Sequence, residues 1–281
     1  MTPRAVMLAV ALVSFASLLL ELALTRLFSV VLFYHFAFFA ISVALLGLGS
    51  GGVFAHIRRQ WLQRFDMRVL GARLCLLNSI LILVAVEVVL HTPVSLEVTG
   101  RNFGKLTIIY LAAAVPFFLT GLLFSVLFAR STDAISHLYG ADLAGGATAC
   151  LAVVPMLNLV GAPNALLLAS ASMAVAGALW AADDRLRKIG YALAAVFVVL
   201  AAANYSGKLV DVIYAKGAYR DPRWVEYARW NAISRIEVNT QLGGRYVVID
   251  ADATTAIMNV DPAHWDQDGA PTPTHTGLPA K

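Results

Sequence analysis

The stretch SLLLELALTRLFSVVLFYHFAFFAISVALLGLGSGG, which runs from Ser17 to Gly52, decides the class of fold. Its acidic and basic side chains are limited to Glu21, Arg26 and His35, and apolar residues fill most other positions. A helix that crosses a bilayer needs about 20 mostly apolar residues, and this stretch is long enough to contribute to two such helices. We therefore expect lipid, rather than water, around much of the chain.

The composition of the whole chain points the same way. Of its 281 residues, 59% are hydrophobic and 14% are charged, and the mean hydropathy is +0.74. Soluble globular domains carry about a quarter charged residues and under half apolar ones. The sequence therefore predicts an all-α polytopic membrane protein with a small β-rich C-terminal extramembrane segment.

Seven segments are apolar and long enough to cross a bilayer. The predicted spans are residues 5–26, 30–55, 69–91, 107–129, 138–159, 164–182 and 188–204. Glycines recur in the second and fifth of them, at Gly47, Gly49, Gly51, Gly52, Gly140, Gly145 and Gly146. Small residues at such spacing predict close helix approach, because packing rather than hydrophobicity drives helix association in lipid.

The basic residues predict the orientation of these spans. Ten lie in segments expected on one side: Arg4, Arg58, Arg59, Arg64, Arg68, Arg73, Arg130, Arg185, Arg187 and Lys188. Three lie on the other side: Arg26, Arg101 and Lys105. Since Lys and Arg concentrate on the cytoplasmic side of membrane proteins, the N-terminus is expected in the cytoplasm. We predict a multi-pass protein of a bacterial inner membrane whose C-terminal segment is periplasmic or extracellular.

The composition changes after about residue 204 and suggests three parts. We assign residues 1–204 to a transmembrane helical domain, 205–260 to a small extramembrane β-containing segment and 261–281 to a disordered tail rich in Pro, Gly and Thr. Ile233–Val238 and Arg245–Ile249 read as strands on either side of a Gly243-Gly244 turn, and Ala253–Val260 as a third strand. A catalytic α/β domain needs more residues than this segment has.

Ionisable side chains at membrane depth are costly and are therefore functional candidates. Glu21 precedes Arg26 by five residues, so on a helix the two lie about 140° apart and do not pair directly. Thr25 shares the face of Glu21. We expect Glu21 to meet a partner on another helix; a carboxyl that serves packing alone is the alternative.

Asp142 and His35 complete the candidate intramembrane polar site of Glu21, Thr25, Arg26, His35 and Asp142. Asp142 stands near the start of the fifth span, where it either complements the helix dipole or joins a buried polar network. His35 lies in an aromatic run that an interfacial belt explains. It has no second metal ligand at i+3 or i+4, so a metal site is not expected.

No pattern in the sequence predicts catalysis by this chain. GxSxG, HExxH and P-loop motifs are absent, as are CxxC pairs and clusters of Cys and His. The acidic residues of the C-terminal segment match its basic ones, so nucleic acid is not an expected partner. We therefore assign no catalytic residue, cofactor or metal, and the lipid bilayer is the expected surrounding.

Three groups of residues resemble the membrane-embedded members of the spermidine synthase-like family. They are Ser17–Gly52, YGADLAGGATACLAVVPMLNLVGAPNALLL (Tyr139–Leu168), and RWNAISRIEV (Arg229–Val238) with YVVIDADATTAI (Tyr246–Ile257). Such proteins carry a multi-helix membrane region ahead of an aminopropyltransferase-type Rossmann domain. The order of the motifs along this chain suits that arrangement.

The resemblance implies that residues 229–260 correspond to the small β-region before the catalytic fold. Asp250 then takes the place of the Asp in an Asp-Gly pair, but Ala251 follows it, and Thr254 or Thr255 stands near the position of a family glutamine. The glycine-rich nucleotide loop and the acidic residues that hold the polyamine and decarboxylated S-adenosylmethionine are missing. The resemblance therefore implies a non-catalytic membrane domain or one half of a split enzyme, with a Rossmann-domain partner protein.

Two other functions stay open. In a transporter-like bundle for small cations such as polyamines, Glu21 and Asp142 would line a polar path. In a structural subunit of a membrane complex, the glycine-rich faces would pack on partners. The predicted orientation also conflicts with a cytoplasmic cofactor of the S-adenosylmethionine type. Either one span is miscounted, or the family's soluble part does something other than polyamine synthesis.

Overall fold

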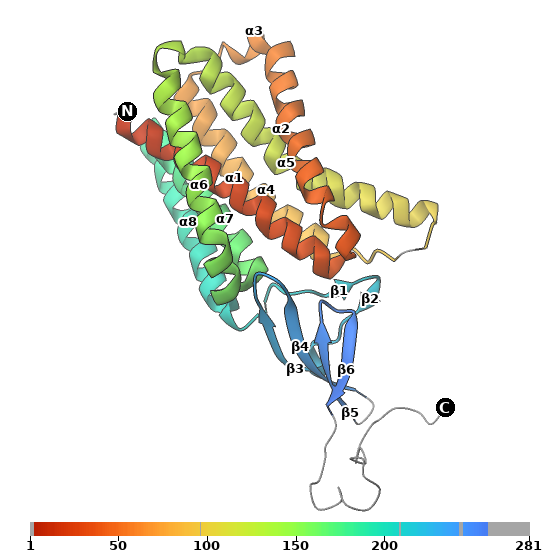
Figure 1. Cartoon of the computed structure of the whole chain (residues 1–281). Coiled ribbons are helices and arrows are strands. Elements are labelled where there is room, and N and C mark those ends of the chain that lie inside the picture. The colour runs from red at the N-terminus through yellow and green to blue at the C-terminus, as the bar shows by residue number, and fades with distance from the viewer. Residues whose placement is uncertain (1–2, 96, 208, 242–243, 258–281) are drawn as a thin grey trace, which may run out of the picture.

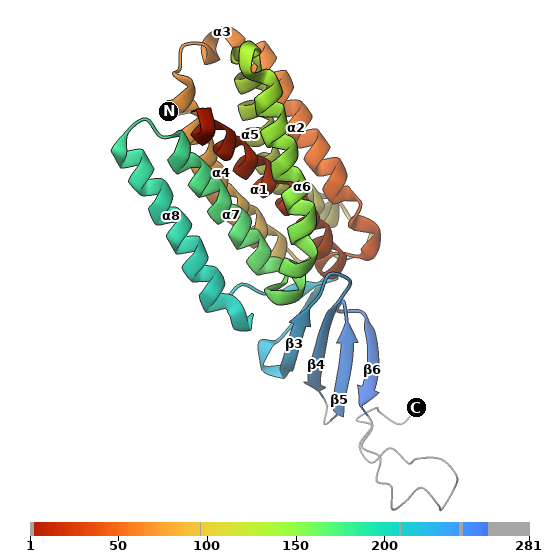
Figure 2. The same ribbon diagram turned by 60° about the vertical axis from the view of Figure 1, so that its left-hand side comes forward.

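The computed structural model describes residues 3–95, 97–207, 209–241 and 244–257. These residues form a bundle of helices with a small β-sheet at one end, as Figures 1 and 2 show. The α-helices are α1 (Pro3–Val31), α2 (Phe39–Ile57), α3 (Arg59–Leu62), α4 (Met67–His91), α5 (Gly100–Arg130), α6 (Ile135–Leu159), α7 (Gly161–Trp180) and α8 (Asp184–Ala203).

Within the described residues, every α-helix except the four-residue α3 is long and apolar enough to span a membrane, which makes seven. This confirms the predicted number of such segments. Four of them begin and end within a few residues of the predicted positions, and α5 begins seven residues before the predicted start at residue 107. The boundary between the first two differs. Helix α1 continues to Val31, five residues beyond Arg26, and α2 begins only at Phe39.

Two local interactions explain the shifted boundary. The charge of Arg26 does not end α1, because its guanidinium contacts the carboxylate of Asp250 in the sheet. The aromatic run that follows forms the connection to α2 instead of continuing as helix. There the Phe39 ring stacks on Phe36 and on Tyr110 of α5, with centroids 5.7 Å and 5.3 Å apart.

Helix α7 lies at the centre of the bundle and packs against α1, α4 and α8. Its sequence, GAPNALLLASASMAVAGALW, is rich in Ala, Gly and Ser, and most of its side chains are buried. Small side chains let neighbouring helices approach on several sides at once. The composition of this one helix therefore accounts for its central place.

Three of the predicted glycines, Gly47, Gly51 and Gly145, pack closely on a neighbouring helix, and two have nothing near them. A Cβ on Gly51 of α2 would collide with the Phe118 carbonyl oxygen and lie 2.7 Å from the Leu122 nitrogen of α5. A Cβ on Gly145 of α6 would lie 2.8 Å from the Ala11 Cα of α1. Gly49 and Gly140 face open space. The difference follows from the helix faces, since Gly47, Gly51 and Gly145 point at a neighbouring backbone and Gly49 and Gly140 do not.

The C-terminal part forms two antiparallel sheets. A short hairpin pairs β1 (Tyr214–Ala215) with β2 (Ala218–Tyr219). The larger sheet has the strand order β3-β4-β5-β6, so each strand pairs with its neighbour in the chain. Its strands are β3 (Val225–Trp230), β4 (Arg235–Gln241), β5 (Gly244–Ile249) and β6 (Ala253–Ile257).

The sequence predicted three of these strands with small errors at their ends. Strand β4 begins two residues later than expected, and β6 is described only as far as Ile257. Strand β3 and the β1–β2 hairpin were missed, because charged residues interrupt the apolar alternation of β3 and the hairpin strands have two residues each. The predicted tail at 261–281 and the proposed turn residue Gly243 lie outside the described residues.

The two glycines of α2 allow a matched test of the helix packing. Gly51→Ala should lower the thermal stability of the protein in detergent, because overpacking against backbone costs about 1–3 kcal/mol. Gly49→Ala should leave it unchanged or raise it slightly, since alanine is about 1 kcal/mol better than glycine within a helix. Equal melting temperatures for the two variants would contradict the α2–α5 packing.

Candidate functional site at the junction of the bundle and the sheet

One carboxylate, that of Asp250, joins the bundle to the sheet. Its Oδ1 accepts hydrogen bonds from the Arg26 guanidinium near the end of α1 and from the backbone N–H of Arg235, the latter at 2.7 Å. The backbone N–H of Asp250 in turn donates to the Arg235 carbonyl at 2.9 Å. Hydrogen bonds to an ionised group are roughly twice as strong as neutral ones. The residue thus fixes both its own strand connection and the helix end.

The turn between β5 and β6 places Asp250 where it can do this. Asp250 and Ala251 have φ values of 52° and 57°, and the Asp252 N–H donates to the Ile249 carbonyl at 3.1 Å. Two left-handed central residues make a turn whose twist matches the flanking strands. Ala251 occupies a position that favours glycine, where the resemblance leads one to expect the Gly of an Asp-Gly pair.

Lys216 makes a second connection between the two parts. Its backbone N–H donates to the Val31 carbonyl at the end of α1, at 2.7 Å, and its Nζ lies 2.9 Å from Asp252 Oδ2. The same Nζ lies 5.8 Å from the centroid of the Phe33 ring. The hairpin that carries Lys216 therefore spans from the helix end to the sheet.

A third connection lies at the α6–α7 corner. Gly161 has a φ of +80°, a conformation that glycine adopts without strain. A Cβ there would lie 2.8 Å from Cδ1 of Trp230, so the indole packs directly on the glycine backbone. Beside it, Asn158 Oδ1 accepts a hydrogen bond from the Ala232 N–H at 2.9 Å. Any side chain at Gly161 would push the sheet away from the bundle.

A cluster of four charged side chains joins β4 to the linker that precedes the sheet: Asp211, Arg220, Arg235 and Glu237. Arg235 and Glu237 are 2% and 1% exposed, and their charged ends contact each other. Arg220 also contacts Glu237, while Arg235 Nη2 lies 2.6 Å from Asp211 Oδ2. Buried charges are tolerated only when paired, and removing one partner of a buried pair costs about 3–5 kcal/mol. The cluster is therefore neutral as a whole and fixes the position of β4.

Burial affects the acid and the base of this cluster in opposite directions. Burial raises the pKa of Asp211 above its ordinary 3.8, although Arg235 and the Val212 N–H act in the other direction. Burial also lowers the pKa of the Arg235 guanidinium. Both shifts favour the neutral forms, as expected for groups moved out of water.

The alternation of β4 is the reverse of an ordinary half-buried strand. Its inward positions Arg235, Glu237 and Asn239 are buried, whereas Ile236 and Val238 lie on the other face and are partly exposed. An antiparallel sheet that covers a core usually turns its apolar face inward. Here the polar face is covered by the linker between α8 and β3, which supplies Asp211 and Arg220, and the apolar face is left partly exposed.

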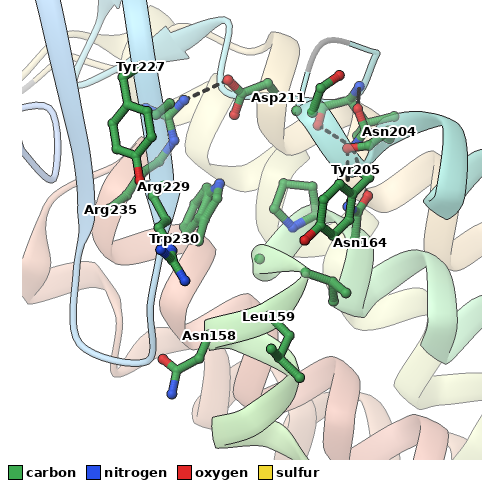
Figure 3. A pocket seen from close by; sticks show the side chains of 17 residues that line it. Asn158, Leu159, Asn164, Asn204, Tyr205, Asp211, Tyr227, Arg229, Trp230 and Arg235 are labelled. Carbon is green, nitrogen blue, oxygen red and sulfur yellow. Dashed lines mark hydrogen bonds and ion pairs between the residues drawn. The ribbon is translucent and has the colours of Figure 1, made fainter.

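A cavity of about 350 Å³ lies between the helix ends and the edge strand β3, and we call it the junction cavity. Figure 3 shows Trp230 and Tyr227 on the side of the sheet and Tyr205 on the side of the helices. Asn164 and Asn204 support the helical side by bonding to each other, with Asn204 Nδ2 2.8 Å from Asn164 Oδ1. The volume is at the lower end of the range for small-ligand sites, about 300–1,000 Å³.

The structure does not gather the five residues of the predicted polar site. Arg26 forms the contact to Asp250, and Thr25 Oγ1 donates to the backbone carbonyl of Glu21 at 2.9 Å. Arg26 therefore serves the junction, and it does not pair with Glu21. His35 lies exposed in the short 3-10 helix η1 (Tyr34–Phe36), and Asp142 is partly exposed on α6.

Glu21 and Asp142 lie far apart along parallel helices. Gly145 of α6 packs against Ala11 of α1, and the two helices run in the same direction in Figure 1. Glu21 lies ten residues beyond Ala11, and Asp142 lies three residues before Gly145. At 1.5 Å per residue, the two carboxylates are separated by about 20 Å along the helix axes. The arrangement offers no support for a polar path that both line.

Apart from Arg26, the residues of the junction were missed as site candidates. Asp211 and Arg229 stand in segments without periodicity, and Arg235 begins a strand whose apolar alternation draws attention to Ile236 and Val238. The sequence signal that could have found them was the RWNAISRIEV motif. It holds Arg229, Trp230 and Arg235, and in the sequence analysis it supports only the resemblance.

The comparisons with known proteins assign nothing further to the site. No protein-family model, curated protein or solved structure matches this chain. Among the described residues, no group of three or more His, Cys, Asp and Glu side chains is placed to hold a metal ion. The junction is therefore interpreted from its own geometry.

The role of Asp250 can be tested by removing its charge. Asp250→Asn should lower the free energy of unfolding by about 2 kcal/mol and speed hydrogen exchange in β4 and β5, because Arg26 loses a charged partner. Glu226→Gln is the matched control, since it breaks an exposed pair with Arg245 in the same sheet, and exposed pairs contribute little to stability. Equal exchange rates in the two variants would show that Asp250 does not dock the sheet.

The Glu226 pair makes a separate expectation about pH. Hydrogen bonds from Thr240 and Arg245 hold the pKa of Glu226 below its ordinary 4.5. A lowered pKa contributes stability that is present above pH 4.5 and is lost as the pH falls through the lowered value. Wild type should therefore lose more thermal stability than Glu226→Gln as the pH is lowered below 4.5. Parallel pH profiles would refute this linkage.

Proposed function

We propose that this chain is a membrane domain that holds a β-platform at the membrane surface for a soluble catalytic unit. The β-platform is the outward face of the larger sheet, formed by Ile236, Val238, Val247 and Ile249. The reversed alternation of β4 carries the proposal, because its polar side chains pair with Asp211 and Arg220 of the linker while its apolar ones are left partly exposed.

The placement in a membrane is supported by the surface of the bundle. The outer helices carry many exposed large apolar side chains, such as Leu45 on α2, Leu151 on α6 and Val199 on α8. Large exposed apolar surfaces are rare on soluble monomers. A bilayer around the seven helices would cover them, and the basic end at α3 would face the cytoplasm of a bacterial cell.

The occupant of the β-platform follows from its chemistry. Ile249 is 41% exposed, and Tyr227, which lies opposite Val238 on the same face of the sheet, is 52% exposed. Half-exposed aliphatic and aromatic side chains on a rigid sheet suit a protein partner, since interface cores are enriched in such residues. The resemblance to the spermidine synthase-like family names the kind of partner, a Rossmann-domain unit. In that reading this chain is the non-catalytic membrane half.

The side of the membrane on which the sheet lies limits the reaction that a partner bound there could carry out. The sheet lies at the end of the bundle opposite α3, around which Arg58, Arg59, Arg64 and Arg68 gather, so the positive-inside rule places it outside the cytoplasm. An odd number of spans, seven, agrees with this, because it puts the C-terminal sheet on the side opposite a cytoplasmic N-terminus. The proposal therefore does not require the partner to synthesise polyamines.

Co-purification tests this proposal. The full chain, produced in its membrane, should retain a Rossmann-domain protein encoded beside it, and the complex should be assayed with putrescine and decarboxylated S-adenosylmethionine. Ile249→Glu should abolish retention, because it places a charge in the apolar contact. Leu209→Glu is the control, since Leu209 is exposed in the segment before the sheet.

Three outcomes separate the parts of the proposal. Retention with activity would support a split synthase, and retention without activity would support the β-platform while rejecting aminopropyl transfer. No retention by wild type, or equal retention by both variants, would overturn the platform. Extraction of the chain by alkaline carbonate would overturn the membrane placement.

A further inference from the structure

The junction cavity has a charge that nothing in the described part of the chain compensates. Its charged lining residues are Asp211, Arg229 and Arg235. Asp211 and Arg235 pair with each other, at 2.6 Å between Oδ2 and Nη2. Arg229 makes no ion pair or side-chain hydrogen bond with any described residue. The cavity therefore carries a net charge of one guanidinium, which favours an anion.

The other polar groups beside Arg229 are donors. Asn158 uses its Oδ1 to accept from the Ala232 N–H, which leaves its amide nitrogen for a ligand. Tyr205 and Tyr227 bring hydroxyl groups to the same lining. In Figure 3 the Arg229 guanidinium lies below the Trp230 ring, on the side of Asn158, whereas Asp211 lies above it. A phosphate group accepts hydrogen bonds at all its oxygens and matches such a set of donors.

The surroundings of the cavity connect it to the apolar surface of the bundle. Leu159, at its rim, is 69% exposed, and Leu151 two turns earlier on the same helix is 81% exposed. Aromatic and basic side chains together at the end of a spanning helix are typical of the headgroup region of a bilayer. A ligand with a phosphate in the cavity would find apolar surface for its chains along α6.

We propose that the junction cavity binds the phosphate group of an anionic phospholipid, with Arg229 as its charged ligand. This inference rests on the membrane placement given above, but it does not depend on a soluble partner. A lipid in this site would sit between the helix ends and β3 and would add a contact between the bundle and the sheet. The shared chemistry is a phosphate ester, whether its source is a lipid headgroup or a free metabolite.

Native mass spectrometry of the detergent-purified full chain tests the site. Dioleoyl phosphatidylglycerol should bind more tightly than dioleoyl phosphatidylcholine, because only the former carries a net negative charge. Arg229→Gln should raise the dissociation constant for phosphatidylglycerol about tenfold. Arg223→Gln is the control, because the Arg223 side chain is 86% exposed and pairs with Asp221 away from the cavity.

A soluble probe distinguishes the two sources of phosphate. If sn-glycerol 3-phosphate binds much more weakly than the lipid, a phospholipid is supported. If it binds as tightly as the lipid, the phosphate site stands and the lipid is overturned as its source. Equal binding of phosphatidylglycerol by wild type and Arg229→Gln, or equal binding of both lipids by wild type, would overturn the site. None of these outcomes depends on Ile249, so failure of the β-platform would be seen separately.

Discussion

The Asp250 carboxylate accepts hydrogen bonds from Arg26 at the end of α1 and from the backbone of Arg235 at the start of β4. Because Asp250 occupies a tight turn, its position is set by the sheet, while Arg26 is set by the helix. Among the described side chains, each of these two charges forms its ion pair with the other, and the Asp250 charge also acts on the Arg235 guanidinium. Much of the junction follows from this contact, including the docking of Trp230 on Gly161 and the enclosure of the charged cluster around Arg235.

The two parts of the structure use different physics to pack. Within the bundle, glycine and alanine bring backbones together, as at Gly51 against α5, because neighbouring lipid would offer no hydrophobic gain. At the junction, paired charges take the role that small residues have in the bundle. Each buried charge needs a partner of opposite charge, because moving a charge out of water costs free energy. A sheet held by paired charges can turn apolar residues outward. An ordinary β-domain cannot, because it needs those residues in its own hydrophobic core.

The sequence sufficed for the helices but not for the junction. Lengths and composition of the spans predicted seven helices, since apolar runs of this size have few alternatives. They could not show that Arg26 meets Asp250, 224 residues away, because nothing local links the two. An ordinary half-buried strand would turn Ile236 and Val238 inward, whereas the structure buries Arg235 and Glu237. Only the partners Arg220 and Asp211, brought in by the linker, make that reversal favourable.

The docking of the sheet is tested most directly by a distance between the two parts. Cys150 is exposed on α6 and accepts a spin label, and Thr255→Cys on β6 supplies the second, with the buried Cys75 replaced by alanine. Double electron–electron resonance in lipid nanodiscs should give one narrow distance distribution, because the contacts of Asp250, Lys216 and Trp230 allow a single placement. A broad distribution, or several separate distances, would contradict a sheet fixed to the bundle.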